Sequence, residues 1–171
     1  MCPKALDFQE MKEKAFAQMR AAKQCVLATA AGDAVTARQV NPVCVGNKLY
    51  FNTSIPTRKY QQITENPKVA IVIDNLQIEG TARPVGHPGD PGNKEYLSVW
   101  TKRLEDDFPP ETVAYSLKLY AKPEVPFQVI EVTPRRFQLY HMPPDFYMDI
   151  IDLEEGTAVR FDNDDTPWDR I

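Results

Sequence analysis

Hydrophobic and polar positions alternate with a period of two over most of this chain, the pattern of strands whose two faces meet different surroundings. The clearest case is residues 76–85, where small or apolar residues alternate with Gln, Glu, Thr and Arg. Similar patterns predict strands over 26–30, 34–45, 48–53, 69–74, 127–132 and 136–141, and a final hairpin of 146–153 and 157–162. Short turns join most of them, so we expect a mainly antiparallel sheet. Six such strands close most easily as a barrel.

The segment 34–45 departs from strict alternation, because the parity of its valines slips in the middle. Together with Pro42, which cannot donate to a ladder, the slip predicts a bulge around residues 38–42. The short turn that follows predicts that this strand pairs with the next one, over 48–53.

Apolar residues at helical spacing predict peripheral helices between these strands. The first covers residues 8–22, and the second runs from about Pro56 to Glu65, with the proline in its first turn. Two more follow the loop GHPGDPG and make a helical insertion at about 90–121. We expect residues 1–162 to form one domain and residues 163–171 to be a polar tail.

Composition and charge narrow the class of protein. Twenty Lys and Arg against 24 Asp and Glu leave a net charge of −4, which disfavours a nucleic-acid reader. The longest apolar runs are far shorter than a membrane span, and the N-terminus is charged too early for a secretion signal. We therefore expect a cytoplasmic protein. Three separated cysteines and two separated histidines predict neither a disulfide framework nor a metal site.

The segment TSIPTRK, residues 53–59, carries the most informative chemistry. It places two adjacent cations, Arg58 and Lys59, in the first turn of the second helix. A helix N-terminus already carries about half a positive charge, so each cation costs a few tenths of a kcal/mol there. A bound anion, most often phosphate, would convert this repulsion into attraction. The alternative is two solvated side chains on an exposed helix.

Arg38 lies in the middle of a strand that is otherwise apolar or neutral. Its side chain either points to solvent or supplies a third cation around the same anion. The second possibility follows if its strand pairs with the one that ends at Thr53.

Taken together, these segments resemble a known family. The order and spacing of TARQV, LYFNTS-x-x-TRK, NPKVAIVI and IEGTARPV, over residues 36–85, are similar to the FMN-binding split barrel of the pyridoxamine 5′-phosphate oxidase-like superfamily. The later segment VIEVTPRRFQLY resembles it more loosely. The resemblance implies a homodimer that binds two FMN molecules in clefts between its subunits.

The resemblance also assigns residues to the flavin. It implies phosphate contacts at Arg38, Thr57, Arg58 and Lys59. It implies a backbone stretch beneath the isoalloxazine ring at Gln39 and Val40, and contacts to the ring and ribityl chain at Asn52 and Thr53. Asn75 and Tyr140 match residues that reach the flavin from the partner subunit.

One departure concerns the substrate. Pyridoxamine 5′-phosphate oxidase itself continues with a basic, histidine-containing motif, where this chain reads HMPPD after Tyr140. We therefore expect an FMN-dependent oxidoreductase that passes electrons from a reduced nicotinamide to a small acceptor other than the vitamin phosphate. The alternatives are a non-catalytic flavin- or haem-binding protein on the same barrel, and a deazaflavin in place of FMN. The sequence assigns no catalytic residue.

Overall fold

The computed structural model describes residues 3–142 and 146–162, so the predicted tail at 163–171 lies outside the described residues. The strands are β1 (Lys4–Ala5), β2 (Cys25–Ala31), β3 (Ala34–Val40), β4 (Val43–Val45), β5 (Lys48–Ser54), β6 (Lys68–Ile73), β7 (Leu76–Pro84), β8 (Phe127–His141), β9 (Tyr147–Asp152) and β10 (Thr157–Asp162). The helices are α1 (Phe8–Ala21), α2 (Arg58–Glu65), α3 (Lys94–Asp107) and α4 (Pro110–Tyr120), with a 3₁₀ turn over Pro91–Asn93.

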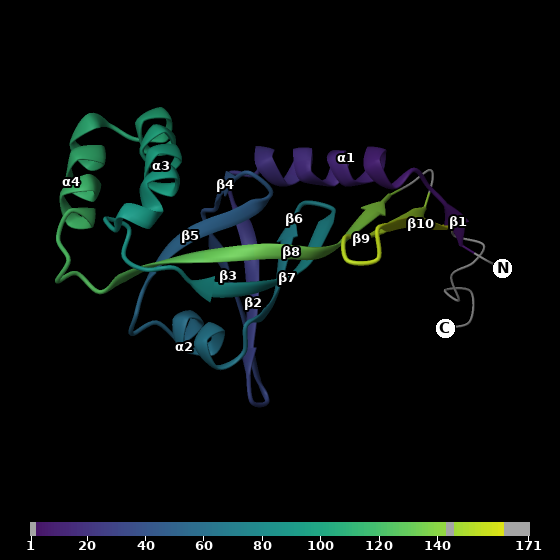
Figure 1. Ribbon diagram of the computed structural model, residues 1–171, viewed down its shortest axis with the longest axis horizontal. Helices are drawn as coiled ribbons and strands as arrows, with labels where there is room; N and C mark the ends of the chain where they lie inside the picture. The colour runs from purple at the N-terminus through teal and green to yellow at the C-terminus, as the bar shows by residue number, and fades with distance from the viewer. Residues whose placement is uncertain (1–2, 143–145, 163–171) are drawn as a thin grey trace.

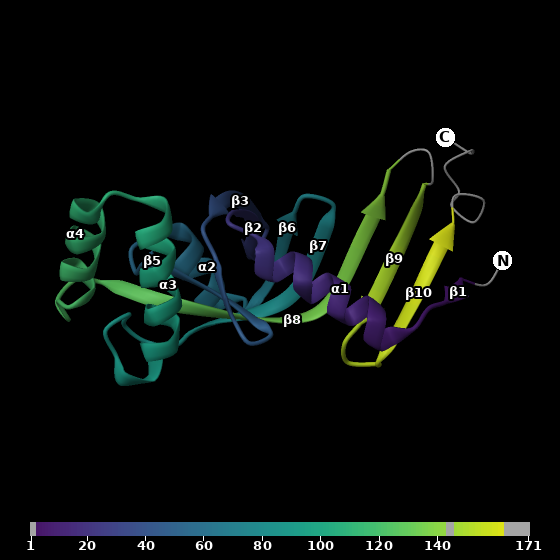
Figure 2. The same ribbon diagram turned by 90° about the horizontal axis from the view of Figure 1, so that it is seen from above.

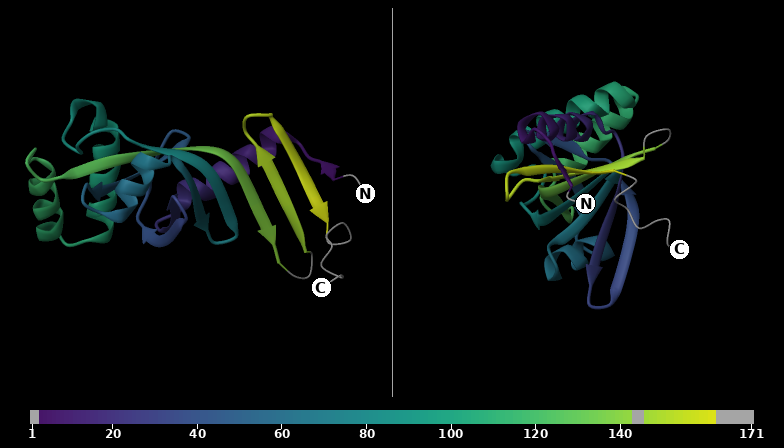
Figure 3. Two further views of the ribbon diagram at one scale, coloured as in Figure 1. Left: turned by 90° about the horizontal axis from the view of Figure 1, so that it is seen from below. Right: turned by 90° about the vertical axis from the view of Figure 1, so that its right-hand side faces the viewer.

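All ten strands belong to one antiparallel sheet with helices around it, so the prediction of a mainly β fold is confirmed. The molecule is elongated (Figure 1), with α3 and α4 at one end and the β9–β10 hairpin, beside β1, at the other. Helices α1 and α3 lie on one side of β8, whereas α2 lies on the other (Figures 1 and 3).

The predicted strand 34–45 is two strands, and the predicted bulge around 38–42 is a break. Over residues 3–142 and 146–162, β3 pairs with β2 alone, and β4 pairs with β5. Pro42 lacks the N–H that a continuous ladder would need, so the chain turns at Asn41–Pro42. The prediction that the strand of Arg38 pairs with β5 is therefore wrong.

This break explains how the barrel is split. Hydrogen-bonded strands follow the path β3-β2-β6-β7-β8-β5-β4, and its two ends are joined only by the chain at Asn41–Pro42. β3 and β5 diverge from that junction. Among the described residues, the outer edge of β3 and the Phe51–Ser54 edge of β5 beyond β4 have no partner strand. Two backbone edges with free polar groups are thus left beside the split.

The two strands predicted over 127–132 and 136–141 are one 15-residue strand, β8. Pairing continues through Thr133 and Pro134, which lie opposite Thr81 and Gly80 in β7, with a register shift at Gly80. A Cβ at Gly80 would lie 2.6 Å from the carbonyl oxygen of Thr133. Because glycine has no side chain, β7 approaches β8 closely enough to keep the ladder intact.

β8 joins the barrel to the C-terminal hairpin. Its first half pairs with β5 and its second half with β9, while β7 follows it along most of its length. Helix α1, capped by Asp7, whose side chain accepts from the N–H of Glu10, lies across the junction (Figure 2). Phe16 of α1 packs edge-on against Phe137 of β8, with ring centroids 5.0 Å apart. A continuous apolar core therefore runs from the barrel to the hairpin.

Helix α2 starts two residues later than predicted. Pro56 precedes the N-cap, Thr57, and Arg58 and Lys59 are its first two residues. The cations therefore occupy the first turn, as the sequence indicated. Before the insertion, the Asp90 side chain accepts from the N–H of His87 and does not cap the 3₁₀ turn that follows it.

Candidate functional site

The N-terminus of α2 has no side-chain cap. The Thr57 hydroxyl donates to the carbonyl oxygen of Ser54 at 2.7 Å and lies 2.9 Å from the Thr53 hydroxyl. It therefore makes no bond to the N–H groups of the first turn. Those N–H groups have no helical acceptor of their own, so they are available to an anion beside Arg58 and Lys59.

Arg38 points to the inside of the barrel and is held by neutral oxygens. Its Nη1 donates to the Thr29 hydroxyl at 2.6 Å and to the Leu27 carbonyl at 3.2 Å. Its Nη2 donates to the Thr36 hydroxyl and, at 3.4 Å, to Oε1 of Gln62. Gln62 is not among the residues predicted from the sequence, although a polar residue at a core-facing position of a short helix was a visible signal. Arg38 thus joins α2 through this buried residue although β3 does not pair with β5.

Two of the predicted phosphate cations, Arg38 and Lys59, are affected by neighbouring positive charge. Burial lowers the pKa of Arg38, and the nearby Arg58 lowers it further. Burial likewise lowers the pKa of Lys59, with Arg38 adding to the effect. Within the described part of the chain, none of the three has a carboxylate within 4 Å. The structure therefore brings together a positive cluster that the protein itself leaves uncompensated.

Gln39 and Val40 complete the β3 segment of the predicted site. The Gln39 side chain points outward and donates to Gln24 at 2.6 Å, whereas the Val40 side chain is buried in the core. Neither side chain joins the cations. Both residues belong to β3, whose outer edge has no partner strand among the described residues; the backbone role that the resemblance implies for them stays a prediction.

Asn52 lies on the outer face of β5, against the helical insertion. Its amide nitrogen is 2.6 Å from the Tyr120 hydroxyl and 3.1 Å from the Tyr96 hydroxyl, and the indole N–H of Trp100 donates to Tyr120 at 3.2 Å. Burial raises the pKa of both tyrosines, which stay neutral. No regularity of sequence spacing indicated that α3 and α4 would hold this asparagine.

Asn75 and Tyr140 meet each other but not the cation cluster. Asn75 occupies the two-residue turn between β6 and β7 and donates to the Tyr140 carbonyl oxygen at 2.7 Å. Phe127 of β8 pairs with Ser54, just before α2, and Tyr140 lies 13 residues farther along that strand. This is about 40 Å of strand at roughly 3.3 Å per residue. The first turn of α2 and Tyr140 are therefore far apart in one copy of the chain.

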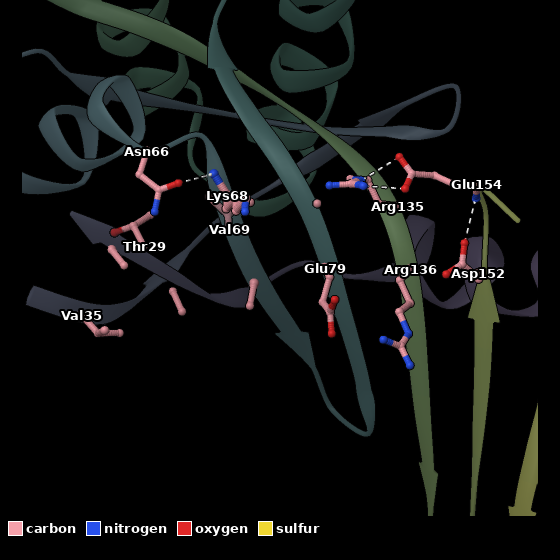
Figure 4. Close-up of a pocket in the computed structure, with 14 residues that line it drawn as sticks. Thr29, Val35, Asn66, Lys68, Val69, Glu79, Arg135, Arg136, Asp152 and Glu154 are labelled. Atoms are coloured by element: carbon pink, nitrogen blue, oxygen red, sulfur yellow. Dashed lines mark hydrogen bonds and ion pairs between the residues drawn. The ribbon is translucent and has the colours of Figure 1, made fainter. Parts of the chain in front are cut away.

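A cavity of about 480 Å³ lies on the opposite, outer face of the sheet (Figure 4). Its lining mixes both charges, with Glu79 on β7 beside Arg136 on β8, and Arg135 paired to Glu154. Arg38, Arg58 and Lys59 do not line this cavity, although Thr29, which accepts from Arg38, does.

The described residues give less support to a metal site, a reactive thiol or a membrane-spanning helix. Over residues 3–142 and 146–162, no group of three or more His, Cys, Asp or Glu could hold a metal ion. Cys25 and Cys44 are free thiols, and burial raises the pKa of Cys25 to about 12 and that of Cys44 to about 11. Such thiols are poor nucleophiles at neutral pH. None of the described helices is long and apolar enough to cross a membrane.

An antiparallel sheet with peripheral helices, consistent with a split barrel, is the architecture that the resemblance implied. The family model for pyridoxamine 5′-phosphate oxidase matches residues 11–141. The chain belongs to the pyridoxamine 5′-phosphate oxidase family. A search of curated proteins finds no match.

Solved structures agree on the fold. A protein of Listeria innocua assigned as a pyridoxamine 5′-phosphate oxidase is 24% identical, with a TM-score of 0.57 over 75% of this chain and 97% of that one. An FMN-binding protein of Nostoc punctiforme related to pyridoxamine 5′-phosphate oxidase is 14% identical, with a TM-score of 0.55 over 92% and 96%. An F420 reductase is 22% identical, with a TM-score of 0.51 over 71% and 93%. At these identities the likeness concerns the fold alone.

Proposed function

We propose that this protein is an FMN-dependent oxidoreductase that passes electrons from a reduced nicotinamide to a small acceptor. The observation that carries the proposal is the uncompensated cluster of Arg38, Arg58 and Lys59 at an uncapped helix N-terminus. A phosphate monoester supplies the missing negative charge and accepts from the free N–H groups. The family and its FMN-binding relative from Nostoc punctiforme favour a flavin phosphate as that ligand.

Each part of the site has a different task in this proposal. Arg58, Lys59 and the first turn of α2 bind the phosphate, together with Thr57. Arg38 adds positive charge from the barrel side. The unpaired edge at Gln39 and Val40 lies beneath the ring, and Thr53 and Asn52 lie along the ribityl chain and the ring. Bound FMN supplies the electron chemistry, while the chain binds and orients it.

We also propose a homodimer in which Asn75 and Tyr140 complete the flavin site of the partner. The distance of Tyr140 from the first turn of α2 within one copy supports this, because a second copy is needed to bring Tyr140 to Arg58 and Lys59. An apolar surface for the second copy lies on the outer face of β2, β3 and β6, where Val26, Val35 and Val72 are 43%, 72% and 42% exposed. Tyr140 lies on the same face of the sheet. Light scattering that reports a monomer with flavin bound would contradict this proposal.

A deazaflavin is the second candidate, favoured by the likeness to the F420 reductase. Haem is less well supported, because Nε2 of both histidines is buried. His87 accepts from the N–H of Gly89 at 3.1 Å, and His141 stacks on Tyr147 with Nε2 3.3 Å from Asp149. A non-catalytic flavin carrier is the remaining alternative. The cytoplasmic location stays a prediction.

One experiment separates these candidates. The absorption spectrum of the purified protein, and of the protein after addition of FMN, F420 or haem, identifies the cofactor. NADH or NADPH is then added without oxygen, with free FMN at equal concentration as the control. Bleaching much faster than in the control supports an oxidoreductase. A flavin spectrum without such bleaching supports a carrier, and binding of F420 in preference to FMN would replace FMN in the proposal.

A further inference from the structure

Gln62 is a buried polar residue in the second turn of α2, with only 4% of its surface exposed. A buried amide is stable only when its polar atoms are hydrogen-bonded. Its Oε1 lies 2.6 Å from the hydroxyls of both Thr29 and Thr36, and Nη2 of Arg38 is 3.4 Å away. Its Nε2 donates to the Ala34 carbonyl oxygen at 3.0 Å. One side chain of α2 therefore connects β2, β3 and Arg38.

The direction of every bond in this network follows from chemistry. A guanidinium can only donate and a backbone carbonyl can only accept, so the amide oxygen of Gln62 faces Arg38 and its NH₂ faces Ala34. The hydroxyls of Thr29 and Thr36 accept from Arg38 and donate to Gln62. All four Nη hydrogens of Arg38 are thus used by neutral acceptors, with Leu27 as the fourth. The guanidinium keeps its Nε hydrogen and its full charge.

We infer that Gln62 is a positioning residue of the phosphate site: it fixes the Arg38 charge against the N-terminus of α2 without neutralising it. The inference rests on the proposed function, because it concerns the same phosphate monoester. A carboxylate in this place would hold Arg38 as firmly but would cancel the charge that attracts the ligand. An apolar residue would leave both threonine hydroxyls and Arg38 without their acceptor.

The Gln62→Glu substitution tests this inference in the full-length protein. We expect FMN affinity to fall at least tenfold, because a negative charge beside Arg38 opposes the phosphate. Riboflavin, which has the same ring without the phosphate, should keep its affinity within about twofold. Gln61→Glu is the matched control, since it adds the same charge at the exposed neighbouring residue. It should lower FMN affinity by less than threefold.

Thr36→Val provides a second measurement that does not disturb the helix. It removes the hydroxyl between Arg38 and Gln62 and keeps a β-branched side chain in a strand. We expect FMN affinity to fall two- to tenfold with riboflavin unchanged, and thermal unfolding identifies variants that fold. If the Gln62→Glu variant does not fold, the FMN and riboflavin affinities of Thr36→Val test the inference in its place.

The outcomes distinguish this inference from the proposed function. A wild-type protein that binds no FMN overturns the proposed function. A wild type that binds FMN, with an unchanged ratio of FMN to riboflavin affinity in every folded variant, overturns the role of Gln62 alone. Equal losses for both flavins would also overturn it, because they would show a general structural effect.

Discussion

The first turn of α2 and the C-terminal hairpin both gather charged side chains, but they compensate that charge in opposite ways. In the hairpin, Asp149 is fully buried and binds Arg160 through both oxygens, at 2.7 and 2.8 Å. Tyr147 packs between Arg160 and His141. At α2, Arg38 is held by neutral acceptors, and over the described residues none of Arg38, Arg58 and Lys59 has a carboxylate within 4 Å. The buried ion pair stabilises the folded chain without a ligand. The unpaired cations repel one another until an anionic ligand binds.

Glu131 is a second compensated cluster, on the outside of the barrel. Tyr50 donates to it at 2.7 Å, Arg83 at 2.8 Å and Lys48 at 3.0 Å. Burial alone would raise the pKa of Glu131, but these three donors outweigh it and lower the pKa to about 2. The barrel therefore contains two kinds of cation. Lys48 and Arg83 are paired with the carboxylate of Glu131, whereas the cations at α2 have no carboxylate partner among the described residues.

The largest expected effect tests the compensated side of this comparison. Asp149→Ala should destabilise the protein by about 3 kcal/mol, because it leaves Arg160 partly buried without its partner. Chemical denaturation measures this change, with Asp162→Ala, an exposed residue at the end of the same hairpin, as the control. Flavin affinity of the folded fraction should not change. A loss below 1 kcal/mol would mean that the hairpin does not depend on this pair.

Arg58→Ala and Lys59→Ala test the uncompensated side. Each charge-assisted hydrogen bond to a phosphate contributes roughly 1.5–3 kcal/mol, so FMN affinity should fall about tenfold to a hundredfold. The affinity for riboflavin should barely change. Arg38→Ala should act in the same direction through its charge. Titration of both flavins measures the difference, and Lys118→Ala, on exposed α4 surface, is the control. Equal losses for FMN and riboflavin would support solvated side chains instead.

The dependence of stability on pH tests the role of Glu131. Because its folded-state pKa is about 2 against an ordinary 4.5, its stabilising effect is complete above pH 4.5 and is lost as the pH falls toward 2. Glu131→Gln should lower stability at neutral pH by about 1–2 kcal/mol, since solvent screens the exposed parts of Lys48 and Arg83. The variant should also lose less stability than the wild type on acidification. Unfolding at several pH values, with Glu124→Gln as control, tests both expectations.

The smallest effect concerns the ligand-free protein. Arg58→Ala and Lys59→Ala each remove a cation from a helix N-terminus and should stabilise the free protein by a few tenths of a kcal/mol. With FMN bound the sign should reverse, because the variants lose ligand stabilisation. Thermal unfolding with and without FMN measures both signs. Destabilisation of the free protein would mean that these cations already have partners in the folded chain.

Local patterns in the sequence determined much of this protein. Alternation located most strands because each has one face in the core, and TSIPTRK placed Arg58 and Lys59 at a helix start because that position needs no distant partner. The pair Thr133-Pro134 led to the wrong prediction of a break between two strands. β8 continues through it because Gly80, about fifty residues earlier in the chain, has no side chain to keep β7 away.

The tertiary structure decided what depends on residues distant in the sequence. Pairing of β4 rather than β3 with β5 opened the split, and the approach of α2 to β2 and β3 brought Gln62 to Arg38. The hydrogen bonds of Asn52 to Tyr96 and Tyr120 likewise form only because the helical insertion packs against β5. Periodicity reports only which face of an element is buried. Which buried polar atoms meet, and whether a charge finds a counter-charge, depends on how the elements pack.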